Sequence, residues 1–333
     1  MKSEVLKALR ERQPISGEEL AKRLHISRTA VWKHINKLRG IGYQITSSPG
    51  RGYSLASVPD LLLPEEIEVG LNTDVFGRKI VFYLELSSTQ DVAKQLAGQG
   101  EGEGTVIIAD SQTHGKGRLG RRWSSPPQQG IYLSIILRPK IEPAQAVQIP
   151  LMAGVAVAQA IEKIRPLNPS IKWPNDLMIN WKKVGGILTE TSAEIDVIDY
   201  VVLGIGLNVN TPRSLFPDDI KESATSLTEE CGEPVSRVKL LQVLLAELEL
   251  LYMQFTTFGF EPIRERWKLL SNTIGAWVEI DGPEEKKMTL KAIDIDQDGA
   301  LILQETDGSI RKVLAGDVTF RSPRREKNRH ATQ

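Results

Sequence analysis

The residues best suited to chemistry lie in one glycine-rich, cationic segment, residues 112–123. It interleaves four cations with three glycines: Lys116, Arg118, Arg121 and Arg122 with Gly115, Gly117 and Gly120. Glycine lets a backbone approach an anion closely, and the cations can neutralise phosphate charge. The spacing matches the dinucleotide fingerprint, but that fold needs a helix directly after the glycines, and Pro126-Pro127 disfavours one. The segment therefore predicts a phosphate-binding loop, with a solvated basic loop as the alternative.

Four other segments place polar residues beside strands or glycines. KWPND at 172–176 puts Asn175 and Asp176 on a turn, where the carboxylate can hold Mg²⁺, orient a lysine or only end the strand. KKVGGIL at 182–188 sets Lys183 before two glycines, which indicate a ligand or a second backbone close by. GIGLNVN at 204–210 holds Asn208 in an apolar strand, where its amide needs partners such as a purine edge. SSTQ at 87–90 places hydroxyls at a strand-to-helix turn.

The first 60 residues predict three short helices and a β-hairpin. Ser16 and Glu19 form a capping box before the second helix, and Ser27 can cap the third. Alternation around a Gly/Pro turn over residues 43–55 predicts the hairpin. This arrangement is typical of a winged helix-turn-helix that binds DNA, although a protein-interaction module of the same shape is the alternative. The DNA-binding candidates are Ser27, Arg28, Thr29, Lys33, Asn36 and, at the hairpin tip, Arg51.

Charge is distributed unevenly along the 333 residues. Residues 1–60 carry 11 Lys/Arg against 5 Asp/Glu, and the rest carries 31 against 37. A basic first domain on an acidic protein favours a nucleic-acid partner over a merely solvated face. The single cysteine, Cys231, excludes an intramolecular disulfide and a cysteine metal site. The charged N-terminus and the lack of an 18-residue apolar run predict no signal peptide, no membrane span and a cytoplasmic location.

Beyond residue 60 the pattern alternates between strands and helices. Strands are expected at 80–84, 104–109, 130–137, 171–173, 184–189 and 201–206, and helices at 88–97, 144–164 and 237–255. The irregular alternation predicts an α/β domain with a mixed sheet. Residues 273–321 return to short strands with Asp-Gly turns, which predict a small all-β unit. The expected domains are 1–60, 61–271 and 272–322, followed by a disordered tail over 323–333.

Taken in order, these five segments resemble the biotin protein ligase family, and in particular its bifunctional bacterial members. The resemblance extends to GAL at 299–301 and LAGDV at 314–318 and covers nearly the whole chain. It implies an α+β multidomain fold: a winged helix-turn-helix, a catalytic domain similar to class II aminoacyl-tRNA synthetases, and a small Src-homology-3-like β-barrel. Two positions depart from the family pattern. Lys116 stands where arginine is usual, and Leu119 stands where a polar residue is common, so the ordering of the loop is the property affected.

The resemblance also implies roles for single residues. Biotin binding falls to Ser88, Thr89, Gln90, Gln112, Lys116, Gly117, Arg118, Lys183 and Gly186. Nucleotide binding falls to Lys116, Arg118, Arg121, Trp123, Asn175 and Asn208. The catalytic group comprises Lys183, Arg118 and Asp176. No metal is expected to be held by the protein alone, and Mg²⁺ is expected to enter with ATP near Asp176.

The implied activity is formation of biotinyl-5'-adenylate from biotin and ATP, followed by transfer to a lysine of the biotin carboxyl carrier protein of acetyl-CoA carboxylase. The adenylate-bound form is expected to dimerise and to repress the biotin operon by binding operator DNA. Three alternatives remain open at this point: a lipoate or octanoate ligase of the same architecture, a ligand-sensing transcription factor without catalysis, and a dehydrogenase that rests on the glycine spacing alone.

Overall fold

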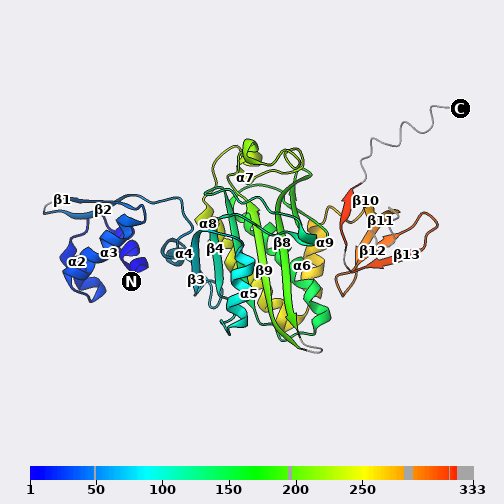
Figure 1. Ribbon diagram of the computed structural model, residues 1–333, viewed down its shortest axis with the longest axis horizontal. Coiled ribbons are helices and arrows are strands. Elements are labelled where there is room, and N and C mark those ends of the chain that lie inside the picture. Colours follow the sequence, from blue (N-terminus) through cyan, green and yellow to red (C-terminus); the bar gives the residue numbers. More distant parts are fainter. Residues whose placement is uncertain (49, 194–196, 281–287, 315, 321–333) are drawn as a thin grey trace.

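The computed structural model describes residues 1–48, 50–193, 197–280, 288–314 and 316–320, which form three units in chain order (Figure 1). A helical unit with a hairpin comes first, a large sheet covered by helices follows, and a small sheet ends the described chain. These are the three kinds of unit that the sequence predicted. The tail predicted for residues 323–333 and the Asp-Gly turn at 281–282 lie outside the described residues.

The N-terminal unit has the predicted three helices and hairpin: α1 (Lys2–Glu11), α2 (Gly17–Leu24), α3 (Arg28–Gly40), β1 (Gln44–Ser48) and β2 (Gly52–Ser57). Ser16 accepts a hydrogen bond from the Glu19 amide at 3.0 Å, so the Ser16 half of the predicted capping box is confirmed, whereas the Glu19 carboxylate accepts from Arg12 at 2.6 Å. Gly52 has φ +101°, and a Cβ there would lie 2.2 Å from the Ile15 carbonyl oxygen. Only glycine therefore lets the hairpin seat against the loop before α2.

A short helix that the sequence analysis missed, α4 (Pro64–Gly70), connects the first two units. No helix was predicted between residue 60 and the strand expected at 80–84, because a helix of seven residues is too short to display helical periodicity. The helix packs between α1 and α8 (Arg237–Phe258), and Lys2 and Arg10 of α1 form ion pairs with Glu65 and Glu66. The N-terminal unit is thus anchored to the central one through charged contacts.

The central sheet has seven strands in the order β3-β4-β5-β9-β8-β7-β6. Their bounds are Ile80–Leu86 (β3), Val106–Gln112 (β4), Gly130–Leu137 (β5), Ser170–Lys172 (β6), Asp176–Ile179 (β7), Lys182–Ala193 (β8) and Ile198–Asn208 (β9). β3 and β4 run parallel, and the other neighbouring pairs run antiparallel. The predicted mixed sheet is confirmed. β7 was not predicted from the sequence, because it has only four residues and its first residue, Asp176, was assigned to a turn.

Helices cover both faces of this sheet (Figure 1). α5 (Thr89–Gly98) covers one face, where Ala93 and Ala97 form a small core with Ile107, Ile136 and Val202. The main core takes the alternate residues of the same strands and packs against the helices α6 (Ile149–Ile164), α8 and α9 (Glu261–Leu270). A further short helix, α7 (Leu227–Cys231), follows β9. Neither α7 nor α9 was predicted.

One helix was predicted too long. Residues 143–148 form a 3₁₀ helix, Pro143–Gln148, so only the part from Ile149 is α-helical within the expected range 144–164. Length and composition alone would allow the stretch from Pro143 to Ile164 to cross a membrane, but 67% of its apolar window is buried inside the fold. Its hydrophobicity is that of a core helix.

The C-terminal unit is an antiparallel sheet in the order β13-β12-β11-β10-β14. Its strands are Trp277–Ile280 (β10), Met288–Ile295 (β11), Leu301–Gln304 (β12), Ile310–Val313 (β13) and Val318–Phe320 (β14). The Trp173 indole donates a hydrogen bond to the Gly299 carbonyl at 3.2 Å, and a Cβ at Gly299 would lie 2.7 Å from Leu151. This sheet is therefore docked closely on the central unit.

Candidate functional site

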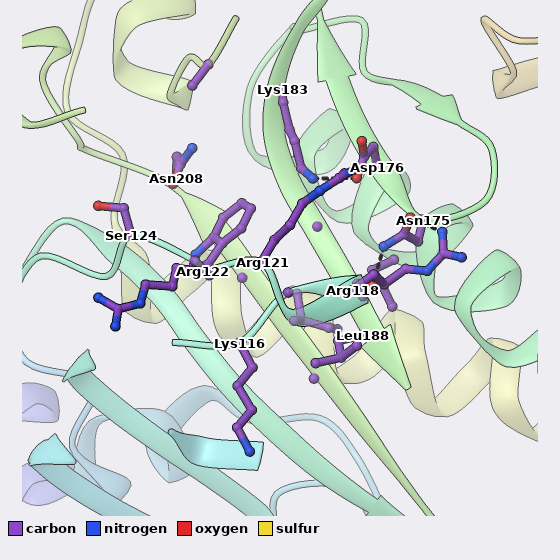
Figure 2. A pocket seen from close by; sticks show the side chains of 18 of the residues that line it. Lys116, Arg118, Arg121, Arg122, Ser124, Asn175, Asp176, Lys183, Leu188 and Asn208 are labelled. Carbon is purple, nitrogen blue, oxygen red and sulfur yellow. Dashed lines mark hydrogen bonds and ion pairs between the residues drawn. The ribbon is translucent and has the colours of Figure 1, made fainter. Parts of the chain in front are cut away.

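One cavity of about 340 Å³ brings together all five segments singled out in the sequence. Its wall includes every residue that the resemblance assigned to biotin, nucleotide or catalysis. Figure 2 shows part of this wall, including Lys116, Arg118 and Lys183. Six cationic side chains line it, Lys116, Arg118, Arg121, Arg122, Lys172 and Lys183, against two carboxylates, Asp176 and Asp317. The volume suits a small molecule, and the excess of positive charge suits an anionic one.

Gln112, at the end of β4, organises the polar end of the cavity. Its side-chain oxygen accepts a hydrogen bond from the Thr89 amide at 2.9 Å, and its nitrogen donates to the Ser125 hydroxyl at 2.9 Å. Ser88 caps α5 and accepts from the Gln90 amide at 3.3 Å. The strand-to-helix turn at 87–90 is thereby held rigid, so its hydroxyls have defined positions before any ligand arrives.

Gln90 and Ser134 form a buried pair behind that turn. The Ser134 hydroxyl lies 2.9 Å from the Gln90 side-chain oxygen and 2.9 Å from the Thr89 hydroxyl, while the Gln90 nitrogen donates to the Val202 carbonyl at 3.1 Å. A Cβ at Gly204 would lie 2.6 Å from the Gln90 oxygen. Gly204 on β9 therefore makes room for Gln90, which acts here by positioning the neighbouring turn.

Trp123 lies flat against two glycines of the sheet. A Cβ at Gly206 would be 2.6 Å from its indole ring, and one at Gly186 would be 3.2 Å away. The indole N–H is buried and makes no hydrogen bond within the described part of the chain. The Lys183 ammonium lies 5.5 Å from the ring centroid, within cation–π range. Trp123 thus forms an aromatic wall with an unused donor.

Asp176 lies between two lysines. Lys183 Nζ is 2.5 Å from its carboxylate, and Lys172 Nζ is 4.0 Å away (Figure 2). Burial lowers the pKa of Lys172 below its usual value, although the charge of Asp176 opposes this shift. Lys172 also lies 5.4 Å from the ring centroid of Phe320, on the C-terminal sheet. The arrangement keeps two ammonium groups next to the cavity around one orienting carboxylate.

Asp317, which precedes β14, holds two cations of the glycine-rich loop. Arg118 lies 3.6 Å from its carboxylate and donates to the Asn175 side-chain oxygen at 3.2 Å and the Gly316 carbonyl at 3.3 Å. Arg121 forms an ion pair with the same carboxylate. Two predicted phosphate ligands are thus already collected at one edge of the cavity.

Lys116 behaves differently from the other loop cations. It forms an ion pair with Asp91 on α5 and extends away from Lys183 and Asp176 (Figure 2). A phosphate contact from Lys116 needs a rearrangement of the loop. Leu119, the other departure from the family pattern, has φ +54° and is 73% exposed, so the loop holds a non-glycine residue in the left-handed region.

The side chains of Asn175 and Asn208, both predicted to bind nucleotide, donate hydrogen bonds to backbone carbonyls of the protein. The Asn175 nitrogen donates to the Ile187 carbonyl at 2.6 Å, and the Asn208 nitrogen donates to the Thr225 carbonyl at 3.0 Å. These contacts support the cavity wall. The Asn208 side-chain oxygen and its second N–H remain available for a contact with adenine.

The donor set does not fit a resident metal ion. The residues that the structure describes contain no cluster of three or more His, Cys, Asp or Glu side chains suited to a metal. The two carboxylates in the cavity, Asp176 and Asp317, are each paired with cations. Mg²⁺ prefers several oxygen ligands, which paired single carboxylates do not provide.

The predicted DNA-binding residues gather on the N-terminal unit. Arg28, Thr29 and Lys33 are exposed on α3, and Arg51 is exposed in the hairpin turn. Ser27 caps α3 by accepting from the Ala30 amide at 3.1 Å, so its hydroxyl already has a structural role. Asn36 is half-buried and accepts from Arg39 at 3.4 Å.

Comparison with known proteins decides the family. The bifunctional ligase/repressor BirA of Bacillus subtilis (strain 168) is 41% identical over 310 residues, which cover 91% of this chain and 93% of the relative. The chain belongs to the biotin protein ligase family. BirA of Escherichia coli (strain K12) is 31% identical over 92% of this chain and 93% of its own.

Each of the three units of this biotin protein ligase family member also matches a family of its own. The biotin/lipoate A/B protein ligase family matches residues 81–208, a helix-turn-helix domain matches 2–54, and the biotin protein ligase C-terminal domain matches 274–321. The structure of the biotin protein ligase from Aquifex aeolicus in complex with biotin and ATP is similar, with TM-score 0.63, 32% identity, and coverage of 73% of this chain and 99% of that one.

Ser134, Lys172 and Asp317 also line the cavity, and none of them was assigned a role from the sequence. Ser134 faces inward from the apolar strand β5, where a lone serine was the available signal. Lys172 is the first residue of the KWPND segment, in which roles were predicted only for Asn175 and Asp176. Asp317 gave no local signal, because its partners Arg118 and Arg121 lie about 200 residues earlier in the chain.

Proposed function

We propose that this chain adenylates biotin with ATP and transfers the biotinyl group to a lysine of a biotin carboxyl carrier protein. The observation that carries the proposal is one cavity in which the cationic glycine-rich loop, the Lys183–Asp176 pair and the polar turn at 87–90 meet. The similarity to a biotin protein ligase structure that contains biotin and ATP supports this assignment of ligands.

In the first half-reaction, a carboxylate oxygen of biotin attacks the α-phosphorus of ATP and pyrophosphate leaves. Lys183 is placed to hold the two anionic groups together, since it can reach the cavity while Asp176 orients it. Arg118 and Arg121 are placed to stabilise phosphate charge once ATP competes with Asp317. The protein supplies no nucleophile of its own, so positioning and charge stabilisation are its contribution.

The two ends of the cavity suit the two parts of the adenylate. Ser88, Thr89 and Gln112 offer donors and acceptors that suit the ureido ring of biotin, with Gln90 and Gly186 shaping the wall. Trp123 provides an aromatic surface and a free indole N–H, and Asn175 and Asn208 line the nucleotide end. Lys116 and Gly117 join the ligand after loop closure, because Lys116 is paired with Asp91 beforehand.

In the second half-reaction, the ε-amino group of a carrier lysine attacks the acyl carbon of the adenylate and AMP leaves. No residue is assigned as the base for this step. Mg²⁺ would enter bound to the phosphates of ATP near Asp176 and would offset their charge, since the residues that the structure describes contain no cluster of side chains that would hold it separately.

The N-terminal unit is assigned to operator DNA. An exposed basic helix face and hairpin suit the major groove and the adjacent backbone. We propose that the adenylate promotes a homodimer, whose two units meet the two halves of a palindromic operator and repress the biotin operon. The bifunctional ligase/repressor relatives support this role.

Finer features of the architecture belong to the same proposal. We assign residues 1–60 to the DNA-binding domain, 61–271 to the catalytic domain and 272–322 to the C-terminal domain. The central sheet is proposed to be related to class II aminoacyl-tRNA synthetases, and the C-terminal sheet to close as a Src-homology-3-like barrel. The enzyme is expected in the cytoplasm.

Biotin-dependent ATP–pyrophosphate exchange, followed by transfer of labelled biotin to a carrier-protein fragment, tests the ligase assignment. Lys183→Ala is expected to reduce exchange by several orders of magnitude, because each 1.36 kcal/mol of lost transition-state stabilisation costs about tenfold in rate. Lys182→Ala is the matched control, since the neighbouring lysine does not line the cavity. Equal exchange by both variants would refute the role of Lys183.

A lipoate or octanoate ligase is the second candidate, because the matching family also contains lipoate ligases. Thermal unfolding with each acid separates the two, since a ligand at 100 times its Kd stabilises the folded state by about 2.7 kcal/mol. Stabilisation by lipoate but not by biotin would overturn the substrate assignment. Ligand binding without any pyrophosphate exchange would favour a sensor without catalysis.

A further inference from the structure

A large apolar side chain lies on the basic face of α3. Trp32 is 54% exposed. The core of the N-terminal unit takes its chain neighbours Val31 and Ile35 and leaves Trp32 outside. At about 100° per residue, the positions of Arg28, Thr29, Trp32 and Lys33 fall within an arc of about 140° on the helix. Trp32 therefore lies among the candidate DNA contacts, although the sequence analysis did not include it.

Stability of the N-terminal unit does not account for a tryptophan at this position. An indole outside the core adds little packing, and a charged side chain would serve a merely solvated face better. Its neighbours Arg28 and Lys33 are both cations, so a partner that covers this face must itself be anionic. A DNA duplex satisfies both requirements, because its phosphates suit the cations and the major groove contains an apolar group, the C5 methyl of thymine.

We propose that Trp32 determines the sequence specificity of operator recognition by placing its indole against a thymine methyl in the major groove. Arg28 and Lys33 then contact phosphates, which anchors the helix without reading the sequence. The position of Trp32 in the N-terminal half of α3 agrees with this division, since that half of a recognition helix approaches the base edges. This inference rests on the proposed DNA-binding role of the N-terminal unit.

Selection from a randomised DNA duplex library, with the full chain, biotin and ATP, provides the first test. We expect the wild type to select a palindromic motif. Trp32→Ala is expected to bind unrelated duplexes as before while its preference for the motif falls at least tenfold, the effect of losing one base-pair contact. Lys33→Ala is expected to weaken binding to all duplexes alike and to reduce the salt dependence.

The second test removes single methyl groups from the selected site by replacing thymine with deoxyuridine. Loss of one buried methyl contact is expected to weaken wild-type binding about fourfold at one thymine in each half-site. Trp32→Ala is expected to bind the thymine and deoxyuridine sites equally. Leu269→Ala is the control, because it shortens another exposed apolar side chain, 88% exposed, on α9 of the central unit.

The outcomes separate this inference from the function on which it rests. If the wild type selects no motif, the proposed operator binding fails, and the role of Trp32 fails with it. If the wild type selects a motif and Trp32→Ala selects the same motif with an unchanged preference, only the inference fails. It is also overturned if wild-type binding ignores deoxyuridine at every thymine, or if Trp32→Ala abolishes dimerisation with biotin and ATP, which would identify a protein contact.

Discussion

Addition of one methyl group at Gly206 is expected to disable the cavity without weakening the fold. Gly206 lies within β9, two residues before its end, and has no left-handed backbone angle, so alanine is compatible with its conformation. Alanine in a strand interior is favoured over glycine by about 0.5–1 kcal/mol. The free energy of unfolding of Gly206→Ala should therefore be unchanged or slightly raised if Trp123 can move.

Trp123 must move because the methyl group added at residue 206 would lie too close to its indole ring. The new Cβ would lie 2.6 Å from the indole ring, whereas carbon atoms in contact are about 3.5–4.0 Å apart. The ring is therefore displaced by about 1 Å toward the cavity. A displacement of about 1 Å in a reacting site can reduce the rate roughly 100-fold. We expect a loss of this size in adenylate formation.

Pyrophosphate exchange and thermal unfolding, measured on the same preparation, check this reasoning. Gly98→Ala is the control, since it adds the same methyl group at the end of α5, where no described residue outside the local helix backbone lies within 4 Å of the new Cβ. The control should retain wild-type exchange and stability. Wild-type exchange in Gly206→Ala would show that Trp123 does not border the ligand. A large drop in its melting temperature would show that the ring cannot move.

Three further predictions concern other parts of the molecule. Gly52→Ala should abolish duplex binding and leave pyrophosphate exchange intact, because its Cβ would lie 2.2 Å from the Ile15 carbonyl oxygen and unseat the hairpin. A gel-shift assay of this variant that matched the wild type would contradict the prediction. Arg237→Met should lower the free energy of unfolding, measured by urea titration, by about 3–5 kcal/mol, because the buried Asp110 carboxylate loses the guanidinium that lies 3.1 Å away. A loss below about 1 kcal/mol would argue against that ion pair. Lys172→Met should be more stable than the wild type at neutral pH, because burial lowers the pKa of Lys172 and penalises its charged form. This penalty is complete below the lowered pKa and shrinks as the pH rises toward the ordinary value of 10.5. Urea titrations should therefore show the difference in free energy of unfolding between the two proteins narrowing as the pH rises. A difference that widens would contradict a lowered pKa.

Local patterns predicted most of the elements that carry the site. The capping residues Ser16 and Ser27 located α2 and α3, and the strand expected at 130–137 matched β5 from end to end. Most of the failures were short elements, although the ten-residue α9 was also missed. β7 has four residues and α4 has seven, which are too few to show a period.

Local patterns could not predict which partners the polar side chains would have. Asn208 was correctly expected to need partners inside a strand, and one of its side-chain N–H groups donates to the Thr225 carbonyl. Lys116 was expected among the phosphate ligands, and in this structure it pairs with Asp91. In both cases the type of side chain indicated that a partner was required, and only the packing of separate segments identified which one.

By itself the sequence determined the chemistry of this protein: cations among glycines, a lysine before two small residues, and a capped helix with a basic outer face. Those properties depend on residues a few positions apart, which share one loop or one helix face whatever the rest of the chain does. Tertiary structure alone decided that Trp123 lies on Gly186 and Gly206, and that Asp317 reaches Arg118. These contacts join strands and loops far apart in the chain, and they exist only because the sheet places β9 between β5 and β8 and the C-terminal sheet docks beside it.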